Sequence, residues 1–62
     1  MNVTLKMEVL KKFGKQYMFC REAKIREDRL SGFITGRIKP NAPEVSRMLL
    51  ALNIKDPKKV GL

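Results

Sequence analysis

Charged side chains of both signs follow one another in the stretch AKIREDRLSGFITGRIKP, residues 23–40. Arg26 and Arg29 can donate hydrogen bonds to anionic groups, whereas the adjacent Glu27 and Asp28 can accept hydrogen bonds. The whole chain carries 14 lysines and arginines against six aspartates and glutamates, a net charge of +8. Such an excess indicates a polyanionic partner, although charge alone does not distinguish DNA, RNA and an anionic lipid surface.

Residues for other kinds of chemistry are scarce. Histidine is absent and Cys20 is the only cysteine, which excludes disulfide frameworks, zinc sites with Cys/His spacing and histidine-based catalysis. No serine or carboxylate has a catalytic partner that the sequence implies. We therefore expect no enzyme and no metal, cofactor or small-molecule substrate, and we expect Cys20 to be a buried packing residue rather than a redox sensor.

The composition also predicts where the protein works. The longest apolar runs are only a few residues, and the N-terminal residues lack the pattern of a signal peptide. A single cysteine suits a reducing compartment. These features predict a cytoplasmic protein without a membrane-spanning segment.

The elements that must position the charged stretch are predicted to be helices. With 62 residues the chain is expected to form a single all-α domain, 1–62. In the first predicted helix Val3, Met7 and Leu10 recur at helical spacing, and Gly14 can end that helix in the left-handed conformation. We expect these three apolar residues to face the core, with Val9 and Phe13 beside them.

Two short helices are predicted next. Phe19, Cys20 and Ala23 form one apolar row, and Ile25 begins another that no single helix keeps on the same face. The second short helix, about residues 27–35, is expected to stop at Gly36. Its apolar residues after Ile25 are Leu30 and Phe33.

A fourth helix is predicted from the pair Asn41 and Glu44, which is typical of a capping box. Its apolar row follows at positions i, i+3, i+4 and i+7 and comprises Val45, Met48, Leu49 and Leu52. Asn53 is a suitable left-handed end. Residues 55–62 are expected to form a short helix or a tail.

The run FGKQYMFCREAKIREDRLSGFITGRIKP, residues 13–40, resembles the helix-turn-helix of the lambda-repressor-like (Cro/XRE) family of DNA-binding proteins. The matching positions are Gln16, Cys20, Lys24, Ile25, Leu30 with Ser31, Phe33, Gly36 and Pro40. The resemblance implies a compact domain of four or five helices with the helix-turn-helix at about residues 16–35. Lys24 stands where the family usually has glycine, which costs on the order of 1 kcal/mol if that position needs a positive φ.

Two further departures lie in the second of these helices. Ile34 replaces the usual acidic residue, so we expect an apolar contact where many relatives form a buried ion pair. Gly32 lowers the stability of the helix by roughly 0.5 to 1 kcal/mol relative to alanine.

The resemblance further implies sequence-specific binding of double-stranded DNA by a small phage-type transcriptional regulator that represses by occupying an operator. The helix at about residues 27–35 would lie in the major groove, where arginine donates to guanine and a carboxylate accepts from cytosine. With Leu30 and Phe33 facing the core, the expected base-contacting residues are Arg26, Glu27, Asp28, Arg29, Ser31 and Gly32. The expected phosphate-binding residues are Gln16, Tyr17, Arg37, Lys39 and Asn41, and a homodimer on a palindromic operator is expected.

Several alternatives remain open at the level of sequence. Glu27 and Asp28 can instead offset the helix dipole without touching a base, and Arg26 and Arg29 can bind phosphates. A protein-interaction module of the same fold, such as an antitoxin, is the alternative from another class. A nonspecific RNA or membrane binder is a third, although the predicted first and fourth helices lack a large aromatic face.

Overall fold

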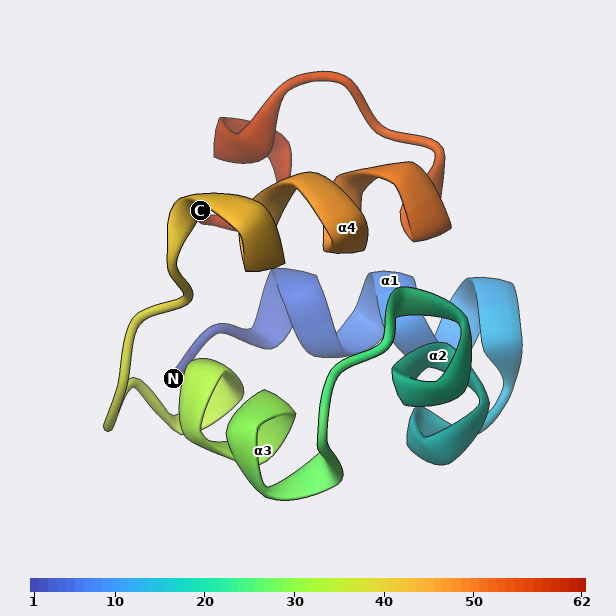
Figure 1. Ribbon diagram of the computed structural model, residues 1–62, viewed down its shortest axis with the longest axis horizontal. Coiled ribbons are helices and arrows are strands. Elements are labelled where there is room, and N and C mark those ends of the chain that lie inside the picture. The colour runs from blue at the N-terminus through green and yellow to red at the C-terminus, as the bar shows by residue number, and fades with distance from the viewer.

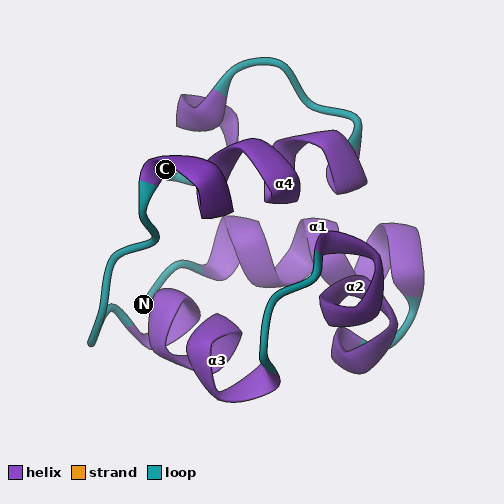
Figure 2. Ribbon diagram, in the orientation of Figure 1, coloured by secondary structure: helices purple, strands orange, loops and turns teal.

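Helices account for every regular element of the protein. The computed structural model describes all residues, 1–62, and contains no strand. Its elements are α1 (Val3–Phe13), α2 (Gln16–Ala23), α3 (Glu27–Thr35), α4 (Ala42–Leu52) and a 3₁₀ turn, η1 (Pro57–Val60) (Figures 1 and 2). The predicted all-α class is confirmed, and the helices begin and end close to the expected residues.

Side-chain caps and left-handed residues set these boundaries. The Asn41 side chain accepts from the backbone N–H of Glu44 at 2.9 Å, and the Glu44 carboxylate accepts from the backbone N–H of Asn41 at 3.0 Å. The capping box expected at the start of α4 is therefore present. At the other ends, Gly14, Gly36 and Asn53 all have positive φ, as the sequence predicted.

Twelve buried apolar residues form the core between α1, α2, α3 and α4. They are Leu5, Val9, Phe19, Cys20, Ala23, Ile25, Leu30, Phe33, Ile34, Met48, Leu52 and Val60. The expected packing role of Cys20 and the apolar contact expected of Ile34 are both confirmed. Figure 1 shows α4 running alongside α1, with α2 and α3 in front of α1.

The face of α1 that packs into this core is not the predicted one. Leu5 and Val9 are fully buried, whereas Val3, Met7 and Leu10 are 50%, 64% and 39% exposed. Both rows have helical spacing, so periodicity alone cannot choose between them. The choice is made by Phe13, which follows Val9 by four residues and packs edge-on against Phe19 of α2 at 5.4 Å between ring centroids.

The connection between α2 and α3 turns at Lys24, which has φ 56° and ψ 47°. The backbone N–H of Ile25 then donates to the Cys20 carbonyl at 2.9 Å, and the Ile25 side chain is buried. A side chain in the left-handed region is strained by contact of its Cβ with the backbone. The strain expected from a lysine at this position is therefore present.

Replacing Lys24 with glycine is expected to raise the free energy of unfolding by about 1 kcal/mol, because glycine adopts a positive φ without that strain. Urea unfolding of the two proteins measures the difference. Lys24→Ala is the matched control, since it removes the charge and keeps a Cβ. Equal gains from both substitutions would show that charge, not backbone strain, limits stability here.

The C-terminal segment packs against the start of the chain. Val60 of η1 is fully buried, and its carbonyl accepts from the Asn2 side-chain amide at 2.7 Å. The Asn2 side chain also accepts from the Leu5 backbone, and the Asn2 backbone N–H donates to the Ile34 carbonyl at 2.5 Å. The region left open as a short helix or a tail is thus a docked 3₁₀ turn, and the two chain ends lie near each other (Figure 1).

Candidate nucleic-acid interface

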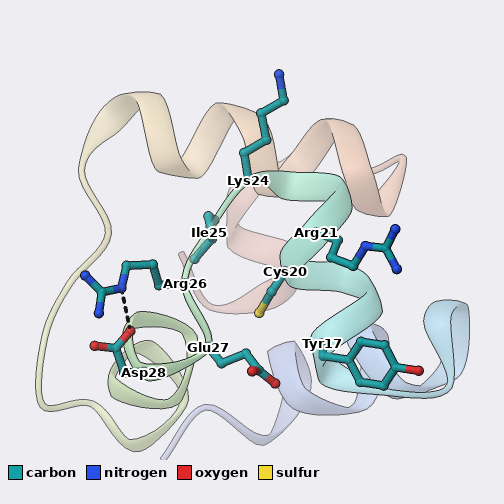
Figure 3. A pocket seen from close by; sticks show the side chains of 8 residues that line it. All are labelled: Tyr17, Cys20, Arg21, Lys24, Ile25, Arg26, Glu27 and Asp28. Atoms are coloured by element: carbon teal, nitrogen blue, oxygen red, sulfur yellow. Dashed lines mark ion pairs between the residues drawn. The ribbon is translucent and has the colours of Figure 1, made fainter.

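The outer side of α3 carries an exposed row of polar residues. Asp28, Ser31 and Thr35 are exposed, and Arg26 and Glu27 are exposed beside them at the start of the helix. Arg26 Nε lies 3.3 Å from Asp28 Oδ1, with both side chains largely in solvent (Figure 3). The row therefore presents hydrogen-bond donors and acceptors to any ligand that approaches α3 from outside.

Arg29 lies on the flank of this row and is half-buried. Its Nε donates to Glu44 Oε2 at 2.6 Å and its Nη2 donates to Glu44 Oε1 at 2.7 Å. The guanidinium also stacks over the Phe33 ring at 5.3 Å from the centroid. Arg29 thus joins α3 to α4 through two of its five N–H groups, and the base contact expected of it stays a prediction.

The Arg29–Glu44 ion pair shifts the pKa values of both side chains. The hydrogen bond from Arg29 lowers the pKa of the Glu44 carboxyl from its ordinary value of 4.5 to about 2, against the opposing effect of burial, with further help from the Asn41 N–H. The same hydrogen bond raises the pKa of Arg29. Both groups therefore stay charged at neutral pH. Glu44 of α4 is bonded to Arg29 of α3 and to the backbone of Asn41 in the connection between the two helices.

Gly32, the glycine within α3, is buried although its neighbours on the outer row are exposed. The structure buries it beneath the side chain of Ile38, so that a Cβ at position 32 would lie 2.5 Å from Ile38 Cγ1 and 2.8 Å from Ile38 Cδ1. Ile38 therefore covers Gly32 on the outer side of α3, and the base contact expected of Gly32 stays a prediction. Ile38, which the sequence analysis did not single out, covers that position, and its side chain is 39% exposed.

The expected phosphate-binding residues fall into two groups. Arg37 and Lys39 are exposed in the connection after α3, where Arg37 Nε donates to Thr35 Oγ1 at 3.3 Å. Gln16 and Tyr17 occupy the first turn of α2, Gln16 half-buried and Tyr17 exposed with Lys15 Nζ at 5.8 Å from its ring centroid. In Figure 1 the start of α2 and the connection that follows α3 lie on either side of α3.

Asn41 is placed differently from these four residues. Its side-chain oxygen and its backbone N–H are both engaged with Glu44 in the capping box of α4. Its side-chain N–H groups, the donors that a phosphate would need, take no part in these bonds, so the phosphate contact expected of Asn41 stays a prediction.

An open hollow lies between α2 and the start of α3 (Figure 3). It is lined by Tyr17, Cys20, Arg21, Lys24, Ile25, Arg26, Glu27 and Asp28. Burial raises the pKa of the Cys20 thiol, and the charge of Glu27 raises it further. Cys20 is therefore a neutral thiol at the base of the hollow, and the cations of the lining stand at its rim.

None of the helices combines the length and the apolar content needed to cross a membrane. No family model matches the chain, and no match is found among curated proteins or among solved structures. A function for this protein therefore has to be argued from its own residues.

Proposed function

We propose that the protein binds double-stranded DNA sequence-specifically, as a small helix-turn-helix transcriptional regulator of the lambda-repressor-like (Cro/XRE) type that acts in the cytoplasm. The observation that carries the proposal is the division of α3 into two sides. Leu30, Phe33 and Ile34 anchor the helix in the core, while the row containing Asp28, Ser31 and Thr35 is exposed. A helix whose inner side is fixed in the core and whose outer side is exposed is suited to insertion into the major groove.

The distribution of cations supports the same arrangement. Arg37 and Lys39 lie in the connection after α3, and Lys15 is the residue before α2. Figure 1 shows this connection and the start of α2 on either side of α3. A recognition helix in the major groove has phosphates on both sides of it, and contacts with these phosphates fix the orientation of the protein. Lys15 makes no side-chain capping bond at the start of α2, so the first N–H groups of α2 are also suited to a phosphate.

The acidic residues of α3 have a role in this arrangement. A carboxylate in the major groove can accept a hydrogen bond from cytosine N4, and an arginine can donate to guanine O6 and N7. Arg26 and Asp28 form an ion pair, so together they are suited to a DNA site that contains both guanine and cytosine. The alternative, that Glu27 and Asp28 only offset the helix dipole, predicts no effect of Asp28 on base preference.

Selection of bound duplexes from a random pool tests the proposal. Enrichment of a defined sequence is expected, and Asp28→Ala is expected to relax the preference at one position of the selected site while the other positions persist. Unchanged preference in Asp28→Ala would favour the dipole role. A bound pool as random as the starting pool would overturn sequence-specific binding itself.

A homodimer on DNA is part of the proposal. A single small domain buries roughly 600 to 1,000 Å² on DNA, which is little for firm specificity, and two copies related by a twofold axis match a palindromic site. Leu50 on α4 is 82% exposed and is therefore the candidate for the dimer contact. Val60 of η1 is buried in its own chain and offers no surface for such a contact.

A protein-interaction module, such as an antitoxin, is a second candidate that one observation favours. The outer face of α1 displays Val3, Met7 and Leu10, between the exposed Lys6 and Lys11. An apolar row in this position contributes nothing to the core and suits a protein partner. The discriminating observation is a stoichiometric partner that binds the natural protein and is lost with Met7→Lys while DNA binding persists.

A further inference from the structure

Ile38 lies on the outer side of α3 although it belongs to the connection that follows the helix. Gly32 comes four residues after Asp28 and three before Thr35, so the three positions share one face of the helix. The Ile38 side chain fills the space next to Gly32, as the 2.5 Å and 2.8 Å approaches to a Cβ at position 32 show. The polar row of α3 therefore has one apolar member, and that member comes from outside the helix.

The backbone fixes Ile38 in this position. The N–H groups of Gly36, Arg37 and Ile38 all point to the Gly32 carbonyl, at 3.0, 3.0 and 3.3 Å. Gly36 has φ 85°, which reverses the chain over the end of α3. These bonds tie the connection to the last turn of the helix and place Ile38 beside Gly32.

We propose that Ile38 contacts the C5-methyl group of a thymine in the bound DNA, an inference that rests on the DNA binding proposed above. Base pairs display donors, acceptors and one apolar group in the major groove, and that apolar group is the thymine methyl. Asp28, Ser31 and Thr35 offer polar groups for the other base edges. Ile38, with 39% of its surface still exposed beside them, offers an apolar surface that a methyl group can cover.

The glycine at position 32 is explained by the same contact. Any side chain there would displace Ile38 from its seat, whereas glycine leaves room for it. Glycine lowers the stability of the helix, but it allows the Ile38 side chain to pack on the outer side of α3.

The test uses the duplex selected by the full-length protein, with each thymine replaced singly by uracil, which differs only by the missing methyl. One replacement is expected to weaken binding by about fourfold, the amount that burial of a single methyl group provides. Ile38→Val, which retains branched methyl groups, should keep this sensitivity. Ile38→Ser should bind the thymine and uracil duplexes equally, and thermal unfolding of each variant verifies that it is folded.

Gly32→Ala provides an independent variant, because it leaves Ile38 in the sequence and displaces it in space. It is expected to lose the same sensitivity to uracil. If the selected site is bound and no uracil weakens binding, or if the weakening persists in Ile38→Ser, the methyl contact is overturned while DNA binding stands. If selection enriches no site at all, DNA recognition and the methyl contact are overturned together.

Discussion

Replacing Glu44 with glutamine is expected to lower the free energy of unfolding by about 2 kcal/mol at neutral pH, the range measured for hydrogen bonds to charged groups. Glu44 accepts two hydrogen bonds from Arg29 and one from the Asn41 backbone. Glutamine has one acceptor oxygen and no charge, so it cannot accept all three of these bonds or pair with the Arg29 charge. Urea unfolding at pH 7 measures the loss, which is a substantial part of the stability of so small a domain.

The same substitution is expected to change how stability depends on acid. The pKa of Glu44 is about 2 in the folded protein and 4.5 ordinarily, so the folded state favours the ionised form. The stability that this ionisation provides is complete above pH 4.5 and is lost as the pH falls toward 2. Glu44→Gln should lack this component of the acid dependence.

The control for this pair of measurements is Glu22→Gln on the exposed surface of α2. It removes a carboxylate that forms no ion pair, and we expect little change in stability at neutral pH. An equally steep loss of stability between pH 4.5 and 2 in Glu44→Gln and in the natural protein would contradict the role assigned to Glu44.

Changing both Arg37 and Lys39 to alanine is expected to weaken binding to every duplex alike, by roughly tenfold to a hundredfold at 0.1 M salt. Each phosphate contact that is lost also removes about 0.9 from the slope of log K against log salt, so the slope should become flatter by about two. Neither residue is assigned to a base, so the preferred sequence should not change. Titrations of a labelled duplex at several salt concentrations measure both quantities.

The double change Lys58→Ala and Lys59→Ala removes the same charge from η1, outside the proposed interface. It is expected to leave the salt slope nearly unchanged. Equal flattening by both double variants would show that the protein attracts DNA through its net charge alone and would argue against specific phosphate contacts by Arg37 and Lys39.

Local features of the fold could be predicted because each depends on residues close in sequence. The capping box of Asn41 and Glu44 has a fixed spacing, and Gly14 and Gly36 mark helix ends by their own conformational freedom. The break between α2 and α3 follows from two apolar rows that one helix cannot unite. These features established the helices and the exposed row at the start of α3.

The contacts between elements could not be predicted in the same way. Arg29 in α3 and Glu44 in α4 are 15 residues apart in the chain, and no local rule relates them, so their ion pair could not be predicted. A glycine in a helix indicates that another group approaches the backbone closely, but it does not indicate which residue supplies that group. The packing of Ile38 against Gly32 could therefore not be predicted. The inner face of α1 likewise depends on the packing of Phe13 against Phe19, which periodicity does not contain.

Asn2 has a consequence for how the domain opens. Its side chain and backbone bond to Leu5, Ile34 and Val60, and the bond to Val60 spans 58 residues of chain. Because one residue bonds to all three, we expect loss of its contacts to favour joint opening of the start of α1, the end of α3 and η1. The amide protons of these distant segments should therefore report a common free energy of opening in hydrogen exchange.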